Sequence, residues 1–201
     1  MKRSKIKEMT LIAIMGGLGA ILMVVFHTPI PFMPPFMDFD LAAIPELIGG
    51  FALGPVAAIG IILVKILLKF VLMGTSSMFT GEIQNLLLSC AYVLPAVIIY
   101  HRKKSKKSAL LGMIVGTIVC SITAVFTNLY IIIPFYASLG NMTVQSIVDM
   151  CAAVNPLMKD TLTLAIFGIV PFNLIKGSAS SLVTYILYKR LSGPIKNFVK
   201  E

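Results

Sequence analysis

Charged residues are scarce in this sequence, and their scarcity decides the broad class of protein. Only 12% of the 201 residues are Asp, Glu, Lys or Arg, whereas 58% are hydrophobic. A soluble domain carries roughly 25% charged residues. Several apolar runs reach or exceed the ~20 residues that cross the hydrocarbon core of a bilayer. The chain is therefore expected to be an all-α integral membrane protein, because its apolar runs lack the polar–apolar alternation of barrel strands.

Cysteine and tryptophan are also rare or absent. The three cysteines, Cys90, Cys120 and Cys151, are odd in number and far apart in the sequence. Neither a disulfide framework nor a metal site is therefore expected. Tryptophan is absent, so the aromatic belts at the membrane interfaces are expected to consist of tyrosine. No glycine-rich phosphate loop is present, so the chain is not expected to bind or hydrolyse ATP.

What charge there is lies in short basic clusters beside the apolar runs, and these produce the net charge of +9. The clusters are residues 1–7, residues 101–107 and a C-terminal group of Lys189, Arg190, Lys196 and Lys200. This is the distribution of the positive-inside rule, which places such clusters in the cytoplasm. The same clusters attract anionic lipid. The basic balance therefore indicates a plasma membrane protein rather than a nucleic-acid-binding one.

The apolar runs and the basic clusters together predict six spans in a single transmembrane domain, 1–201. The run 41–73 is too long for one crossing and is divided at Gly54-Pro55, where a helix stop precedes a proline-initiated helix. The predicted spans are about 9–26, 41–53, 55–73, 83–100, 108–136 and 161–188. Span 41–53 is short and is expected to lean on its neighbours rather than on lipid.

This span count predicts that both termini are cytoplasmic. The segments that then lie outside, about 27–46, 74–82 and 137–160, contain six of the eight acidic residues. The two histidines, His27 and His101, fall on opposite sides of the membrane. A membrane enzyme, which would need paired acids or a histidine with partners, is therefore disfavoured.

Six polar residues lie at membrane depth, where each is a functional-site hypothesis. They are Lys65, Lys69, Asn85, Asn128, Asn173 and Lys176. Other interpretations stay open for three of them. Lys69 is expected to extend to the interface, Lys65 to pair with Glu82 or Glu46, and Asn85 either to join the site or to pack helices by a hydrogen bond.

The segment from Pro171 to Lys176 carries the sharpest signal. Asn173 and Lys176 are three residues apart and so share one helix face. Pro171 is interpreted as a helix break that frees backbone carbonyls, which are tolerated only where they face protein or a cavity. The span count brings these residues to the outer half of the protein with Asn128. Converging amides and one cation suit a neutral, flat ligand with many hydrogen-bonding groups.

The outer segment 27–40 adds apolar surface to this site. Its four prolines stiffen it, so it is expected to form a lid over the ligand, although a rigid connector is the alternative. In the first span, Ala13 and Gly17, and also Gly16 and Ala20, lie four residues apart. Such small-residue stripes allow close helix approach. They indicate either docking of a second membrane subunit or packing within this chain.

These residues resemble a known family, the substrate-binding S-components of energy-coupling factor (ECF) vitamin transporters, and above all its riboflavin-specific members. The resemblance covers nearly the whole chain. It is carried by Ala13-x-x-x-Gly17, the loop "PIPFMPPFMDFDLAAIPEL", "FALGPVAAI" followed by Lys65, Asn85, "TNLYIIIPFY" and "GIVPFNLIKG". The family's stripe is Ala-x-x-x-Ala, and the glycine at position 17 still permits close approach.

The resemblance implies high-affinity capture of riboflavin from outside the cell, with riboflavin as cargo rather than cofactor. Asn128, Asn173 and Lys176 would bind the isoalloxazine ring or order the groups that do. Asp40 and Asn85 would contact the ribityl chain or support the site, and Phe36 and Met37 would pack on the ligand. Ala13 and Gly17 would dock on a transmembrane coupling subunit that joins two ATPase subunits. The alternatives are a different vitamin or precursor as cargo, or a stand-alone membrane carrier.

Overall fold

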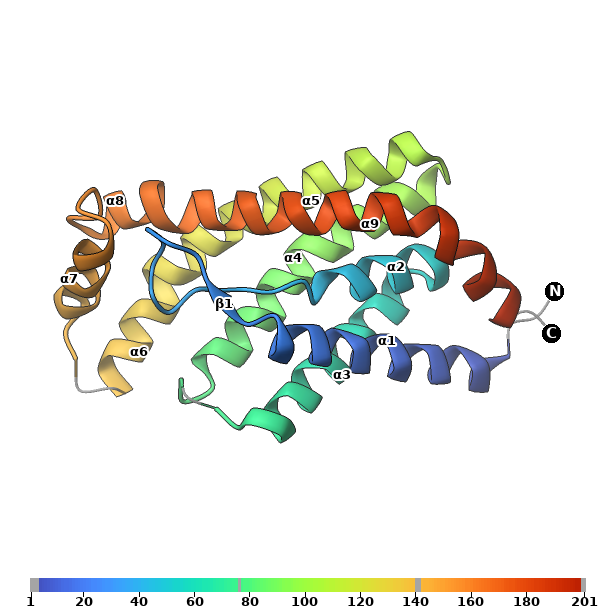
Figure 1. Ribbon diagram of the computed structural model, residues 1–201, viewed down its shortest axis with the longest axis horizontal. Coiled ribbons are helices and arrows are strands. Elements are labelled where there is room, and N and C mark those ends of the chain that lie inside the picture. The colour runs from blue at the N-terminus through green and yellow to red at the C-terminus, as the bar shows by residue number, and fades with distance from the viewer. Residues whose placement is uncertain (1–3, 76, 140–141, 200–201) are drawn as a thin grey trace.

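The computed structural model describes residues 4–75, 77–139 and 142–199 as a bundle of helices with one short hairpin (Figure 1). The elements in order are α1 (Lys5–Val25), β1 (Thr28–Pro29), β2 (Asp38–Phe39), α2 (Ala43–Leu53), α3 (Pro55–Met73), α4 (Thr80–Arg102), α5 (Lys106–Thr127), η1 (Asn128–Ile132), α6 (Ile133–Leu139), α7 (Val144–Val154), α8 (Thr161–Leu164), η2 (Ala165–Ile169) and α9 (Val170–Val199). The two η elements are π-helical turns.

Five helical stretches of the described residues are long and apolar enough to cross a membrane. They are Lys5–Val25, Pro55–Met73, Thr80–Arg102, Lys106–Leu139 and Thr161–Tyr188. They match five of the six predicted spans to within about three residues at most ends, with Lys5 starting earlier. The fourth stretch joins α5, η1 and α6, and the fifth joins α8, η2 and the first part of α9.

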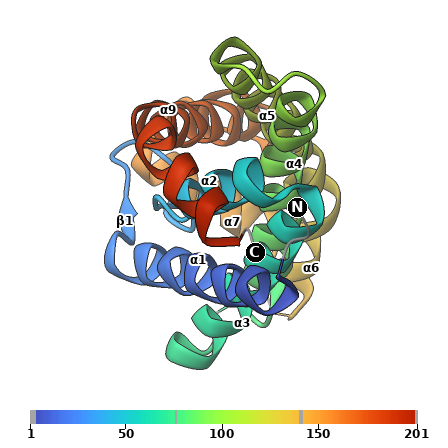
Figure 2. The same cartoon turned by 90° about the vertical axis from the view of Figure 1, so that its right-hand side faces the viewer.

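The remaining predicted span, 41–53, corresponds to α2, which has only 11 residues. Ten of these, Ile44–Leu53, are buried, because α1, α3, α4 and α9 all pack against this helix. Figure 2 shows α2 near the middle of the bundle in the end-on view. The prediction that this segment leans on protein rather than on lipid is confirmed, and a short helix can lie there because it has no lipid thickness to match.

The division of the long apolar run at Gly54-Pro55 is also confirmed. Gly54 has φ of 117°, a conformation that favours glycine, and it ends α2. Pro55 follows as the first residue of α3, where its missing N–H leaves no hydrogen bond unmade. The Lys5 end of α1, the α4–α5 connection and the C-terminal part of α9 lie toward one end of the molecule (Figure 1). The hairpin, α6 and α7 lie toward the other end.

Pro171 does not break its helix, and here the prediction is wrong. The chain stays helical through it, and the widened π turn η2 ends two residues earlier. A proline clashes with the carbonyl four residues before it, which for Pro171 is the carbonyl of Phe167 inside η2. At this point the helix has the hydrogen bond of a π turn, in which the Val170 N–H donates to Ala165 O, five residues back. The wider turn therefore accommodates the proline without ending the helix.

The fourth stretch of helix shows the same arrangement. Pro134 also lies two residues after the end of a π turn, η1, and the carbonyl it would meet is that of Tyr130 within the turn. The Ile133 N–H donates to Asn128 O, again five residues back. Two helices of the bundle thus carry a π turn followed by a proline at the same spacing.

Close packing of α4 on α5 fixes the wall behind the site. This helix pair has the most extensive contact in the described structure. A Cβ atom added at Gly112 would lie 2.6 Å from the carbonyl oxygen of Ala96, and one at Gly116 would overlap the carbonyl oxygen of Tyr92. Only glycine permits this separation of the two backbones.

Candidate functional site

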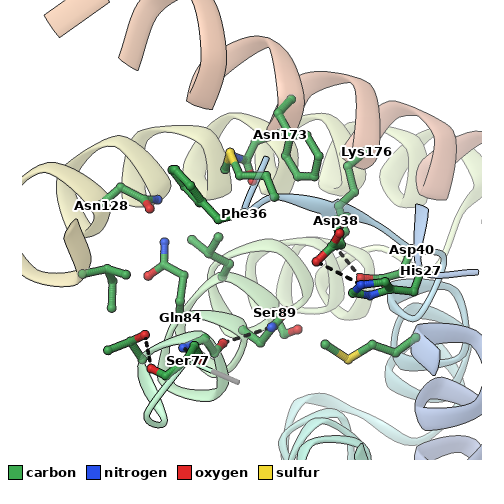
Figure 3. Close-up of a pocket in the computed structure, with 18 of the residues that line it drawn as sticks. His27, Phe36, Asp38, Asp40, Ser77, Gln84, Ser89, Asn128, Asn173 and Lys176 are labelled. Carbon is green, nitrogen blue, oxygen red and sulfur yellow. Dashed lines mark hydrogen bonds and ion pairs between the residues drawn. The ribbon is translucent and has the colours of Figure 1, made fainter. Parts of the chain in front are cut away.

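A cavity of about 480 Å³ lies among the hairpin segment, α3, α4, η1, α6, α7 and α9 (Figure 3). Its volume is within the range of about 300–1,000 Å³ that is usual for small-molecule sites. All seven residues predicted to bind a ligand line this cavity: Phe36, Met37, Asp40, Asn85, Asn128, Asn173 and Lys176. The structure thus brings together side chains from four separate parts of the chain, and contact of each with a ligand stays a prediction.

The segment 27–40 folds over the cavity as a hairpin. Thr28 pairs with Phe39 and Pro29 with Asp38 in a two-stranded antiparallel ladder. His27 Nε2 lies 3.3 Å from Asp38 Oδ2, which ties the two ends of the hairpin together. Phe36 at its tip is 40% exposed and Met37 is buried, so the predicted apolar face of the lid reaches the cavity.

Lys176 is held at the cavity by the second strand of the hairpin. Its Nζ lies 2.7 Å from Asp40 Oδ2 and donates to Asp38 O at 3.3 Å. The other carboxylate oxygen, Asp40 Oδ1, accepts a hydrogen bond from the Ala42 N–H. Burial by itself raises the pKa of Asp40, but the Lys176 ammonium and these hydrogen bonds outweigh it and leave that pKa lowered. Asp40 is therefore a charged residue that positions Lys176.

Two more lysines line the cavity, and each also has an acidic partner. Lys65 Nζ lies 2.6 Å from Glu46 Oε1 and donates to Ser89 Oγ at 2.8 Å. Lys69 Nζ lies 2.7 Å from Glu82 Oε1. Glu46 is therefore the partner of Lys65, one of the two that the sequence left open. Glu82 lies at the start of α4, in the segment predicted to lie outside, and extension of Lys69 to the interface stays a prediction.

The three cavity asparagines share one hydrogen-bonding pattern. Each donates from Nδ2 to the carbonyl four residues earlier in its own helix: Asn85 to Gly81 at 3.0 Å, Asn128 to Ala124 at 2.7 Å and Asn173 to Ile169 at 2.8 Å. Because that partner is an acceptor, the amide nitrogen must face it. Each side chain thus keeps its oxygen for other partners. Among the described residues, only Asn173 Oδ1 receives a weak contact, from Cys120 Sγ at 3.8 Å.

Apolar side chains complete the cavity wall. Leu88, Ile132, Ile133, Tyr136 and Phe172 line it beside the asparagines. A flat, largely apolar ring with hydrogen-bonding groups at its edges suits such a lining. Among the described residues, no group of three or more His, Cys, Asp or Glu side chains could hold a metal ion.

Sequence reasoning missed several polar residues of the cavity, among them Ser77, Thr80, Ser89 and Gln84. Gln84 has the longest side chain of these four. It lies in the second turn of α4 beside Asn85, near the end of a span, where a glutamine is unremarkable. The signal was available in the spacing of Gly81, Gln84 and Leu88, which places all three on the cavity face of α4.

The small-residue stripes of α1 have separate surroundings. A Cβ at Gly16 would lie 2.5 Å from Val64 Cγ1, and Ala20 is buried, so this pair packs against α3. Ala13 is exposed, and a Cβ at Gly17 would come no nearer than 4.0 Å to Leu68 Cδ1. The two interpretations of the sequence thus divide between the stripes: Gly16 and Ala20 serve internal packing, and Ala13 and Gly17 face outward.

Comparison with known proteins decides the family. A family model described as "ECF transporter, substrate-specific component" matches residues 7–188. The chain belongs to this family. It is therefore a component of a membrane transporter and not an enzyme, as the sequence predicted.

Individual relatives agree with the S-component assignment over nearly the full length. The chain is 32% identical to the riboflavin transporter RibU of Staphylococcus aureus (strain TCH60) over 97% of this chain and 93% of the relative. It is 23% identical to the riboflavin transporter FmnP of Bacillus subtilis (strain 168), over 93% of each. A solved S component of a bacterial ECF transporter shares the fold with a TM-score of 0.73 and 31% identity, covering 96% of this S-component and 99% of that chain.

Proposed function

We propose that this S-component captures riboflavin from outside the cell for an ECF-type importer. The observation that carries the proposal is the cavity, in which an apolar, aromatic-bearing lining meets three asparagine oxygens and the Lys176 ammonium. Full-length similarity to proteins named riboflavin transporters supports the same ligand. Asn128, Asn173 and Lys176 bind the ring or order the groups that do. Asn85 and Asp40 serve the ribityl chain or the wall around it, and Phe36 and Met37 pack on the ligand.

The first test is the colour of the protein. Protein purified from cells supplied with riboflavin is expected to be yellow, with flavin fluorescence quenched. Protein freed of flavin should quench added riboflavin at submicromolar concentration and should prefer it in competition with thiamine, biotin and folate. A preference for one of those vitamins would keep the transport class and change the cargo, and absence of any flavin binding would remove the proposal.

FMN tests the charge of the cavity. Sequence reasoning counted a single lysine in the site, but three line it, and Lys65, Lys69 and Lys176 are each paired with a carboxylate. The charge of each lysine is thus already neutralised by a carboxylate, so these groups offer a phosphate no net positive charge. FMN is therefore expected to bind at least tenfold more weakly than riboflavin in a fluorescence-quenching titration, and equal affinity would contradict this account of the three pairs.

We further propose six passes with both termini in the cytoplasm, counting α2 as the sixth crossing within the single domain 1–201. The common end of the molecule shared by α1, the α4–α5 connection and α9 supports this orientation (Figure 1). A cysteine introduced at Ser105, in that connection, should be labelled by a membrane-impermeant maleimide only after the cells are opened. A cysteine at exposed Phe32 in the hairpin segment should react in intact cells. The reverse pattern would contradict the orientation.

Import would require partners. We propose that this S-component works with a transmembrane coupling subunit and two ATPase subunits in the plasma membrane. The outward-facing Ala13 and Gly17 surface would meet the coupling subunit. Liposomes containing this chain alone should bind riboflavin without accumulating it. Accumulation by the chain alone would favour the stand-alone carrier.

A further inference from the structure

Gln84 is the cavity side chain whose amide oxygen and amide nitrogen both lack a hydrogen bond within the described structure. Its Oε1 and Nε2 atoms are buried and have no hydrogen-bond partner among the residues that the structure describes. The remaining described side chains with such atoms, Glu46, Ser180 and Thr184, do not line the cavity. A buried amide without partners is costly in a folded protein and calls for an explanation.

The position of Gln84 points to the cavity for that explanation. Gln84 lies on the face of α4 that lines the cavity, one residue before Asn85. In Figure 3 its carboxamide extends away from α4 toward the side of the cavity where Asn128 and Phe36 lie. The three asparagines satisfy their nitrogens on their own helices, whereas Gln84 keeps both its donor and its acceptor.

We infer that Gln84 is a ligand-contacting, specificity-determining residue of this S-component. It donates from Nε2 and accepts at Oε1 from two adjacent groups of the ligand, one an acceptor and one a donor. This inference rests on the proposed function and deepens it. Riboflavin offers that chemistry in two places, the C=O and N–H edge of its ring and neighbouring hydroxyls of its ribityl chain.

The unpaired state of Gln84 gives the inference a signature that a structural residue would not show. Without ligand, the buried amide destabilises the protein, so an apolar side chain of similar size should stabilise it. With ligand, the same replacement removes two hydrogen bonds and leaves the ligand's groups unpaired. Stability of the ligand-free protein and affinity should therefore change in opposite senses.

The experiment compares wild type with Gln84→Leu and Gln84→Met, and with Gln145→Leu as a matched control. Gln145 is the other glutamine of the chain and lies in α7, where its Nε2 donates to Asp149 outside the cavity. Affinity is measured by quenching of riboflavin and of lumiflavin, which has the ring without the ribityl chain. Melting temperature is measured in detergent without and with riboflavin.

Both Gln84 variants are expected to weaken riboflavin binding at least tenfold and to raise the ligand-free melting temperature, while the control changes neither. An equal loss for lumiflavin would place the contact at the ring edge, and unchanged lumiflavin binding would place it on the ribityl chain. Unchanged riboflavin affinity, or a lower ligand-free melting temperature, would overturn the inference. Wild type that binds neither flavin would instead refute the proposed function.

Discussion

At the scale of single residues, buried charge is organised in pairs. Glu46 is fully buried and Lys65 is 2% exposed, and the other carboxylate oxygen of Glu46 has no hydrogen-bond partner among the described residues. Such a pair adds little stability over an apolar replacement, but removing one partner leaves an uncompensated charge. The pair therefore makes the helices α2 and α3 depend on each other at the wall of the cavity.

Replacing one member of this pair should be severe. Glu46→Gln is expected to lower the free energy of unfolding by about 3–5 kcal/mol, because Lys65 would remain buried and unpaired. Thermal unfolding in detergent measures the effect. Glu82→Gln is the matched control: its partner Lys69 has a side chain 20% exposed, so the loss should be smaller. Glu46→Leu combined with Lys65→Met should recover most of the stability. Failure to recover would show that the ion pair itself stabilises the fold more than an apolar pair does.

Lys176 is the second residue to test, since it lines the cavity while Asp40 holds its ammonium group. Lys176→Ala is expected to weaken riboflavin binding at least tenfold, because a charge-assisted hydrogen bond contributes about 1.5–3 kcal/mol. Quenching titrations measure it, with the melting temperature as the check on folding. Unchanged affinity would remove Lys176 from the site.

The pH dependence of this pair follows from the lowered pKa of Asp40. A carboxyl with a lowered folded-state pKa stabilises the fold above its ordinary value of 3.8 and loses that contribution as pH falls through the folded-state value. Riboflavin affinity should therefore not change with Asp40 ionisation between pH 5 and 8. A change there that disappears in Asp40→Asn would contradict this.

Sequence patterns found the residues whose polarity is anomalous for their depth. Asn128, Asn173 and Lys176 stand out because the middle of a span should be apolar, and the structure places all three at one cavity. Gln84 was missed because a polar residue near the end of a span is ordinary. The partner of Lys69 was missed for another reason. Met78 and Phe79, just before α4, adopt positive φ, and the sequence does not suggest a turn of this kind ahead of Glu82.

At the scale of helices, the bundle relies on close approach where glycine permits it. Gly116→Ala should push α5 away from the carbonyl of Tyr92 and lower the free energy of unfolding by about 1–3 kcal/mol. Thermal unfolding measures this. Gly193→Ala in α9 is the matched control: no atom lies within 4 Å of its added Cβ, so no loss is expected. Equal effects of the two substitutions would show that the α4–α5 contact is not the cause.

The helices were predicted well and their irregularities were not. Apolar length and the basic clusters sufficed for five spans and for the division at Gly54. The π turns were not foreseen, because a proline in a span indicates a disturbance without saying which kind. Helix α7 was not foreseen either, since 11 residues with mixed polarity are too short for a span signal.

At the scale of the whole molecule, we propose that the outward-facing Ala13 and Gly17 stripe serves transport and not ligand binding. Ala13→Leu or Gly17→Leu is expected to abolish riboflavin uptake by cells while leaving riboflavin binding by the purified chain unchanged. Gly16→Leu is the matched control, since it would collide with Val64 and should destabilise the chain itself. Loss of binding in Gly17→Leu with assembly intact would mean that the stripe is internal packing.

The pairing of every cavity lysine has an electrical consequence for import. Charge moved through a membrane potential gains or loses about 2.3 kcal/mol per elementary charge per 100 mV. The charge of Lys65 is cancelled by Glu46, that of Lys69 by Glu82 and that of Lys176 by Asp40. Riboflavin itself is neutral. Whatever movement delivers the ligand inward, these three pairs would contribute almost no gating charge to it. Uptake at saturating ATP should keep the same rate when an ionophore collapses the membrane voltage.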